Sequence, residues 1–188
     1  MKTLERGFKA WSERTSLAVR KELELGVDEA LCPFQLAGHL DIEVLRPEEV
    51  RGITDDVLKA LLHDDPWGWS ATSFSSDDRS TIIFNPRHSA GRRSSNIAHE
   101  LAHELLGHQP ATMIVSLELD NFCMRSFNQK QEDEANCLGW TLLLPREVLL
   151  RAKLKKKSTS EIARQFGVSE PLVNFRVQMT GIGKQVRN

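Results

Sequence analysis

The residues with the clearest chemical potential form the run His99-Glu100-Leu101-Ala102-His103. On a helix, side chains four residues apart lie on one face with their bases about 6 Å apart, so His99 and His103 can offer two imidazole nitrogens to one metal ion. Glu100 is rotated by about 100° from His99, which brings its carboxylate nearer to a metal-bound water than to the metal. Two nitrogen ligands, an adjacent carboxylate base and an open coordination position are what zinc-dependent hydrolysis requires.

The stretch around this run is expected to be helical and largely buried. Two surface histidines on an amphipathic helix are the alternative interpretation, because five-residue matches also occur by chance. Apolar neighbours weigh against that alternative, since buried paired histidines need a polar partner. We expect Ser94 or Ser95 to cap the helix and Gly107 to end it. The apolar neighbours are Ile97, Ala98, Leu101, Ala102, Leu105 and Leu106.

A third ligand is expected downstream, because two histidines do not complete a protease zinc site. Residues 129–144 are predicted to form a second helix, and four of them share one face: Glu132, Ala135, Asn136 and Gly139. A carboxylate on this face could reach the metal, while the two small residues would let the helices approach closely. Asn136 could hydrogen-bond a ligand imidazole and fix its orientation. The alternative is an acidic helix start that favours the helix dipole.

The elements expected to position these two helices include both helices and strands. Thr54 is expected to cap one of the preceding helices. Residues 81–84 could hold an extended substrate by backbone pairing, if they form the edge beside the cleft. Residues 113–119 could be a strand or the lining of a groove, and residues 121–128 a loop. We expect helices over residues 12–26, 28–38 and 55–62, strands over 42–45, 67–71 and 80–84, and a hairpin turn over 75–79.

The segment from residue 146 to 188 differs from the rest in charge and pattern. It holds ten Lys/Arg against three Asp/Glu, a net charge of +7, in a chain whose total charge is −1. Ser158 and Glu161 fit a capping box, and Gly167 and Ser169 then separate two short helices in a helix-turn-helix rhythm. This pattern, with Arg176 on its second helix, could bind DNA. The same apolar positions equally make a docking subdomain, which is the interpretation we favour.

Two motifs together resemble the ImmA/IrrE family of metallopeptidases. The first is His99-Glu-Leu-Ala-His103, preceded by Arg92 and Arg93. The second is Glu132-x-Glu-Ala-Asn-x-x-x-x-x-Leu-Leu-Leu-Pro145, with 28 residues between His103 and Glu132. The order of the preceding elements also agrees, so the resemblance covers roughly residues 15 to 180.

This resemblance implies an α+β fold with two parts. Residues 1–145 would form a zincin-like metalloprotease core, mostly helical with a small twisted sheet. Residues 146–188 would form a small C-terminal helical subdomain, helix-turn-helix-like and packed on that core. The implied function is a zinc-dependent endopeptidase that acts on a protein or peptide, such as a helix-turn-helix repressor. The competing class is a DNA-binding or protein-binding regulator whose metal site is structural or inactive.

The resemblance also implies the site residues. His99, His103 and Glu132 would be ligands of Zn²⁺, and Glu100 would be the general base. Glu134 competes with Glu132 for the third position, because acidic residues two apart on a helix cannot both face the metal. Glu132 is preferred, since a polar residue four positions later matches the related zinc-protease pattern.

The chain departs from the family pattern in two respects. Leu138-Gly139 stands where the family usually shows Phe-Ala, which leaves the packing argument intact. The chain also contains no tyrosine, a residue that related proteases often use to stabilise the oxyanion. His108, Arg92 and Arg93 are candidates for that role, but we assign none of them.

Composition favours a cytoplasmic protein without a membrane segment. The first ten residues are mixed and charged and lack the apolar core of a signal peptide. No run approaches the roughly 18 apolar residues of a membrane helix. Cys32, Cys123 and Cys137 are odd in number and widely spaced, so we expect reduced thiols rather than disulfides or a zinc clip.

Overall fold

Three strands form one mixed sheet in the computed structural model, which describes residues 3–76, 79–108 and 128–186. β1 (Glu43–Leu45) runs parallel to β3 (Arg79–Phe84), and β2 (Ala71–Ser76) runs antiparallel to it, so the strand order is β1-β3-β2. The expectation that residues 81–84 form an edge for substrate is therefore wrong. A strand that pairs with neighbours on both sides has no backbone groups left for a third.

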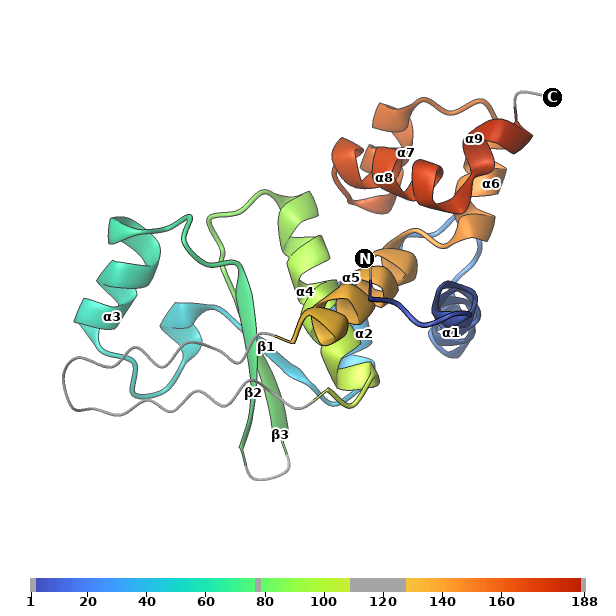
Figure 1. Ribbon diagram of the computed structural model, residues 1–188. Helices are drawn as coiled ribbons and strands as arrows, with labels where there is room; N and C mark the ends of the chain where they lie inside the picture. The colour runs from blue at the N-terminus through green and yellow to red at the C-terminus, as the bar shows by residue number, and fades with distance from the viewer. Residues whose placement is uncertain (1–2, 77–78, 109–127, 187–188) are drawn as a thin grey trace.

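Helices make up most of the described chain, and with the small sheet they confirm an α+β fold. Figure 1 shows α1, α4 and α5 on one side of the sheet and α3 toward the other. The Thr54 side chain accepts a hydrogen bond from the Val57 amide and caps α3, as expected. The helices are α1 (Phe8–Glu22), α2 (Pro33–His39), α3 (Asp55–Lys59), α4 (Ala90–Leu105), α5 (Gln129–Leu143), α6 (Arg146–Leu154), α7 (Thr159–Phe166), α8 (Glu170–Thr180) and α9 (Ile182–Gln185), with a 3₁₀ turn η1 (Pro47–Glu49) and a π turn η2 (Ala60–Asp64).

Close packing of α4 against α5 is the central contact of the fold. A methyl group added at Gly139 of α5 would stand 2.8 Å from the carbonyl oxygen of Ala98 on α4. The predicted role of Gly139 in letting the two helices approach is therefore confirmed. Around this contact, Ile97, Leu101, Leu138 and Leu142 are completely buried, so α4 and α5 together supply much of the apolar core.

The first two helices begin and end at other residues than expected. α1 spans Phe8–Glu22 rather than residues 12–26, and the chain beyond it turns through Glu24 at a φ of 55°. α2 begins at Pro33, five residues after the expected start at residue 28. Proline suits the first turn of a helix because its missing N–H would have no intrahelical partner there. Pro33 therefore lies at the start of the helix, whereas the expected range of 28–38 would have placed it in the interior.

α4 begins about one turn earlier than Ser94 or Ser95, the expected caps. Ala90 is its first residue, with Ser89 at the N-cap. A methyl group added at Gly91, in this first turn, would lie 2.9 Å from the backbone nitrogen of Ser169. The early start is thus packed directly against the turn between α7 and α8. A tertiary contact of this kind cannot be read from helix propensity.

β2 begins at Ala71, so the strand expected over residues 67–71 is wrong. The indole N–H of Trp69 donates to the carbonyl of Leu61 at 2.9 Å. The buried Asn85 amide group donates to the carbonyl of Trp69 at 3.0 Å. These long-range hydrogen bonds hold the segment before Ala71 as a loop, although its aromatic residues favour a strand.

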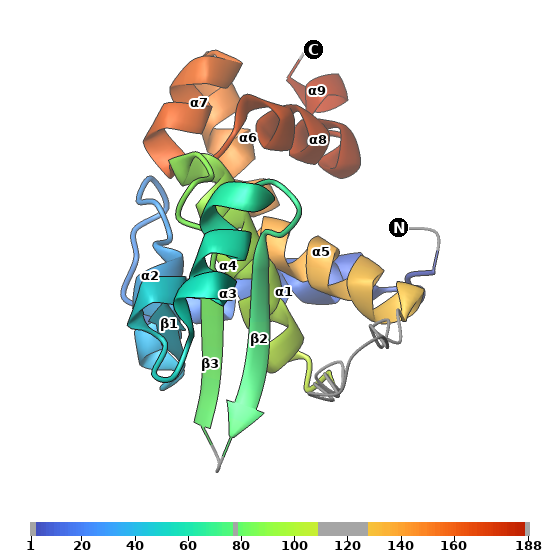
Figure 2. The same ribbon diagram turned by 90° about the vertical axis from the view of Figure 1, so that its left-hand side faces the viewer.

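Helices α6 to α9 gather at one end of the molecule in both ribbon views (Figures 1 and 2). The Ser158–Glu161 capping box and the left-handed Gly167, with a φ of 62°, are confirmed. Arg176 of α8 is completely buried. Its guanidinium donates to the Leu144 carbonyl at 2.9 Å and pairs with the Glu13 carboxylate of α1 at 2.8 Å. Whether residues 146–188 form a separate subdomain stays a prediction.

Several expectations fall partly or wholly outside the described residues. Of the predicted turn over residues 75–79, Ser75, Ser76 and Arg79 belong to β2 and β3, while Asp77 and Asp78 are not described. The predictions for residues 113–119, residues 121–127 and Cys123 also lie outside the described ranges. No helix in the described part of the chain is long and apolar enough to cross a membrane.

Candidate metal centre

Three side chains from α4 and α5 converge at the contact between the two helices. The Nε2 atoms of His99 and His103 are 3.1 Å apart. Glu132 of α5 reaches both rings, with one carboxylate oxygen 3.3 Å from Nε2 of His99 and the other 3.6 Å from Nε2 of His103. The structure therefore brings together the three residues that the sequence proposed as metal ligands. Their role as ligands remains a proposal.

The spacing of these donor atoms fits a tetrahedral metal ion. A tetrahedral site with bonds of about 2.0–2.1 Å has ligand atoms about 3.4 Å apart. The two imidazole nitrogens are 3.1 Å apart, and the nearer carboxylate oxygen lies 3.3 Å from Nε2 of His99, so both distances are close to that value. The side chains of His99 and His103 are about one-fifth exposed and that of Glu132 is 30% exposed, so the cluster can be reached from solvent. The donor set of two imidazoles and one carboxylate is one that zinc accepts.

Glu100 lies beside this cluster but does not belong to the converging set. It is 7% exposed, and its Oε2 accepts a hydrogen bond of 2.8 Å from the Ser73 hydroxyl on β2. The helix turn between His99 and Glu100 directs the carboxylate toward the sheet side of α4. The hydrogen bond from Ser73 limits the rotation of the Glu100 carboxylate, which suits a group that would accept a proton from a fixed direction.

His108 occupies a position that the sequence analysis did not assign. Its Nδ1 lies 2.9 Å from Nδ1 of His103, and its Nε2 lies 3.2 Å from a carboxylate oxygen of Glu134. Glu134 therefore faces His108, whereas Glu132 faces the two converging Nε2 atoms. The alternative that Glu134 provides the third ligand is not supported by this arrangement.

A Schellman turn at the end of α4 explains how His108 reaches His103. Gly107 has a φ of 62°, and the chain folds back so that the His108 amide donates to the His103 carbonyl at 3.0 Å. In this motif the second residue after the C-cap, here His108, packs near the third-last residue of the helix, here His103. The signal was present in the sequence, since Gly107 was expected to end the helix and His108 follows it directly.

The other polar residues considered for the site lie in less direct positions. Within the described residues Asn136 makes no hydrogen bond to either imidazole, so the support expected from it is absent, and Nδ1 of His99 is buried without a partner. Arg92 donates to the Ser70 hydroxyl at 3.4 Å, and Arg93 donates to the Pro86 carbonyl at 3.2 Å. Arg92 therefore contacts the segment before β2, and Arg93 contacts the segment before α4.

Residues 58–178, more than half of the chain, match the peptidase family described as the IrrE N-terminal-like domain. The chain belongs to this peptidase family. The match begins within α3 and runs through the sheet hairpin, α4 and α5 to α8, so the whole candidate metal centre lies inside the IrrE-like region. The family resemblance proposed from the two sequence motifs is confirmed. No curated protein matches the chain.

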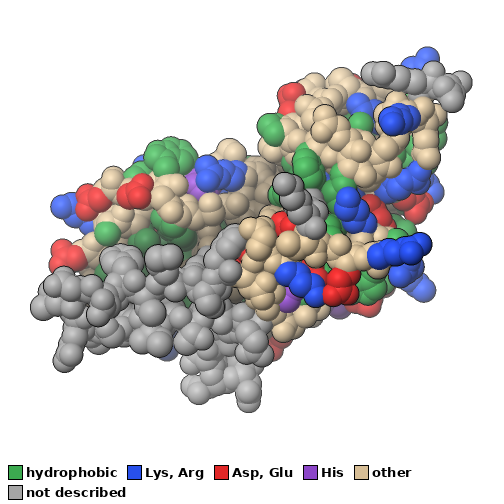
Figure 3. Space-filling model, viewed as in Figure 1, with side chains coloured by type: hydrophobic (Ala, Val, Ile, Leu, Met, Phe, Trp, Pro, Cys, Tyr) green, Lys and Arg blue, Asp and Glu red, His purple; other side chains and the backbone are tan. Residues whose placement is uncertain are grey.

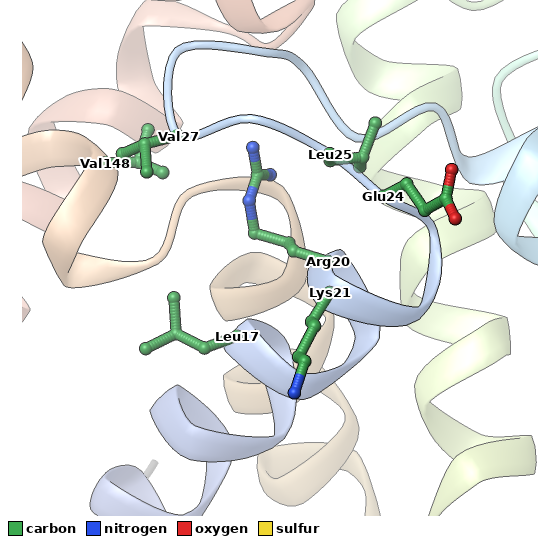
Figure 4. A pocket seen from close by; sticks show the side chains of 7 residues that line it. All are labelled: Leu17, Arg20, Lys21, Glu24, Leu25, Val27 and Val148. Atoms are coloured by element: carbon green, nitrogen blue, oxygen red, sulfur yellow. The ribbon is translucent and has the colours of Figure 1, made fainter.

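A pocket of about 300 Å³ lies outside this centre, beside the end of α1 (Figure 4). None of the three converging residues lines it; its walls are Leu17, Arg20, Lys21, Glu24, Leu25, Val27 and Val148. Arg20 is buried, which lowers the pKa of its guanidinium, and it donates to the backbone carbonyls of Gly26 and Glu29. These bonds fasten the loop after α1, so the pocket in the IrrE-like protein has a structural arginine at its centre.

Proposed function

We propose that this member of the peptidase family is a zinc-dependent endopeptidase. His99, His103 and Glu132 would hold the ion, and Glu100 would be the general base. The observation that carries the proposal is the convergence of two imidazole nitrogens, 3.1 Å apart, with the two oxygens of one carboxylate, which lie 3.3 and 3.6 Å from them, on two helices that are fixed against each other at Gly139. Residues 1–145 would then form the zincin-like core, with residues 146–188 as a helical subdomain packed on it.

The chain's own residues would supply the proton transfers. Zinc held by these residues would lower the pKa of a coordinated water toward neutrality and would polarise a peptide carbonyl. Glu100, oriented by Ser73, accepts the proton of the attacking water. The same carboxylate then delivers that proton to the leaving amine, so that one peptide bond and one water become a carboxyl group and an amine.

The substrate is proposed to be a regulatory protein such as a DNA-binding repressor in the cytoplasm. This part of the proposal rests on the family resemblance alone. A search among purified helix-turn-helix repressors, with cleavage followed by mass spectrometry, would identify the substrate and the bond that is cut.

Zinc content and a base variant together test the proposal. The purified chain should bind about one zinc ion, and His103→Ala should lose it because one of the three ligand atoms is gone. Glu100→Gln should keep zinc and lose cleavage, since the amide has the shape of the carboxylate but cannot accept the proton. Undiminished hydrolysis of a verified substrate by Glu100→Gln would refute the assignment of the base.

DNA binding by the C-terminal helices is the second candidate function, and the structure gives it less support. Arg176, the arginine on the second helix of the pair, is completely buried and paired with Glu13. Lys155 pairs with Asp28 at 2.6 Å. On the face shown in Figure 3, basic and acidic side chains are interspersed around the C-terminal helices. Salt-dependent binding of the full chain to duplex DNA would restore this candidate.

A further inference from the structure

Three polar side chains form a continuous line away from the candidate metal centre. His103 faces the cluster with Nε2 and faces His108 with Nδ1, at 2.9 Å. His108 uses its second ring nitrogen to contact the Glu134 carboxylate at 3.2 Å. The side chains of His108 and Glu134 are only 8% and 13% exposed, so water competes little for these contacts. Each member of the line comes from a different place: α4, the turn after it, and α5.

The chemistry of imidazole fixes the direction of the hydrogen bonds along this line. If Nε2 of His103 is to bind a metal, its proton must be on Nδ1. Nδ1 of His108 must then accept a hydrogen bond from the Nδ1–H of His103, so the proton of His108 itself is on Nε2. That N–H points at the Glu134 carboxylate, which can only accept. With both imidazoles neutral, one arrangement of protons satisfies both contacts, and in it the proton of His103 is on Nδ1, so that Nε2 carries the lone pair that a metal requires.

We propose that His108 and Glu134 are positioning residues that hold His103 in its metal-binding tautomer and orientation through a Glu134–His108–His103 relay. This inference rests on the proposed zinc site and adds a function for two residues outside the ligand set. A carboxylate at the end of the line makes His108 a better acceptor and His103 a more basic ligand. The relay replaces the support that the sequence led us to expect from Asn136.

The backbone makes the relay rigid at both ends. The Schellman turn joins the His108 amide to the His103 carbonyl, so the two rings are held by main-chain geometry as well as by their own contact. Glu134 is carried by α5, which is pressed against α4 at Gly139. Lys130, one turn earlier on α5, lies 3.9 Å from the Glu134 carboxylate. The relay thus links the position of α5 to the orientation of a ligand on α4.

Two substitutions of His108 separate the relay from simple filling of space. His108→Phe keeps the ring volume but removes both polar atoms, so zinc affinity should fall by about 10–100-fold. His108→Gln offers an amide oxygen to accept from His103 and an amide N–H to donate to Glu134, in the same order as the imidazole. It should therefore recover part of the lost affinity. Glu134→Gln, which keeps an acceptor without its charge, should show a smaller loss than His108→Phe.

The experiment measures zinc affinity by competition with a chromophoric chelator, together with the unfolding free energy of each zinc-free protein. His88→Phe is the matched control. His88 is also buried, and its ring contacts Asn96 of α4, but it does not belong to the converging set of His99, His103 and Glu132. It should lower stability without changing zinc affinity. NMR of zinc-loaded protein with ¹⁵N-labelled histidine should show the His103 proton on Nδ1, with its hydrogen-bonded shift lost in His108→Phe.

The outcomes distinguish the relay from the zinc site on which it rests. Weak zinc binding by His108→Phe, recovered in part by His108→Gln, supports the relay. Wild-type zinc affinity in both His108→Phe and Glu134→Gln overturns the relay while leaving the proposed zinc site intact. Equal losses in His108→Phe and His108→Gln also overturn it, since a side chain of the right polarity should help. Absence of zinc binding by the wild-type chain overturns both proposals.

Discussion

The two ends of α4 use histidine in opposite ways. Near its beginning, His88 is buried, hydrogen-bonded to Asn96 and stacked on Trp67 with ring centroids 5.6 Å apart. Near its end, His99 and His103 turn ring nitrogens toward each other and toward a carboxylate. The first arrangement holds the segment before α4, and the second brings several potential ligand atoms close together. Residue type alone does not make a metal ligand; convergence of several donors does.

Zinc binding should stabilise the end of α4 that carries His99 and His103, and should leave the end at Ala90 unchanged. Saturating zinc should raise the unfolding free energy by about 4 kcal/mol at a free concentration of one thousand times the dissociation constant, because only the folded chain joins α4 to α5 at the cluster. Hydrogen exchange should show new protection at the end of α4 and in α5. Equal protection at the Ala90 end would break the comparison. His103→Ala should show neither effect.

Two glycines allow the packing of the two ends to be compared directly. Gly139→Ala should cost about 1–3 kcal/mol of unfolding free energy, because its methyl group would meet the Ala98 carbonyl, and it should also weaken zinc binding by moving α5. Gly91→Ala meets the backbone of the α7–α8 turn and should cost a similar amount with no loss of zinc affinity. Chemical denaturation and zinc titration would measure both.

A third glycine supplies the control for these substitutions. Gly38 of α2 has no atom within 4 Å of an added methyl group, so Gly38→Ala should leave stability unchanged or raise it slightly. A loss of zinc affinity in Gly91→Ala as large as that in Gly139→Ala would mean that the two ends of α4 are coupled.

The pH dependence of stability should report on His88. Burial lowers the pKa of this imidazole, and the nearby Arg92 lowers it further. The unfolded chain, with a histidine pKa near 6.5, is then protonated at a higher pH than the folded chain. The unfolding free energy therefore decreases as the pH falls below that value. Zinc-free wild-type protein should lose stability more steeply than zinc-free His88→Phe, by at most about 1.4 kcal/mol per pH unit. Parallel curves would contradict this.

Asn136→Ala should have the smallest effect of these variants on the metal centre. Because Asn136 makes no hydrogen bond to either imidazole in the part of the chain that the structure describes, its removal should leave zinc affinity close to that of the wild type. A loss comparable to that of His108→Phe would show that the amide, and not the relay, supports the ligands. The chelator competition described for His108 measures both variants side by side.

Local signals in the sequence were sufficient for the parts of the fold that depend on local contacts. α5 was predicted almost to the residue, because its amphipathic pattern ends at Pro145, and the Ser158 cap followed from its own neighbours. Helix periodicity identified the face of α5 that carries Glu132, and the preference for Glu132 over Glu134 came from the family pattern. In each case the partners lie within a few residues or on one helical face.

The features that sequence reasoning missed depend on residues far apart in the chain. The start of β2 is set by the bond from Asn85 to Trp69, and the start of α4 by the approach of Ser169. The contact of His108 with Glu134 requires the crossing of α4 and α5, which periodicity does not specify. Gly107 predicted the turn that brings His108 back to His103. It did not predict that Nε2 of His108 would contact Glu134.

The buried ion pair between Arg176 and Glu13 has a consequence for the order in which the protein matures. Its two members are separated by 163 positions, so α1 leaves the ribosome long before its partner on α8 is made. Until then, Glu13 and the Leu144 carbonyl at the end of α5 lack the guanidinium that joins them. The guanidinium contact that joins the end of α5 to α1 therefore forms only late in synthesis, after nearly all of the chain has been made.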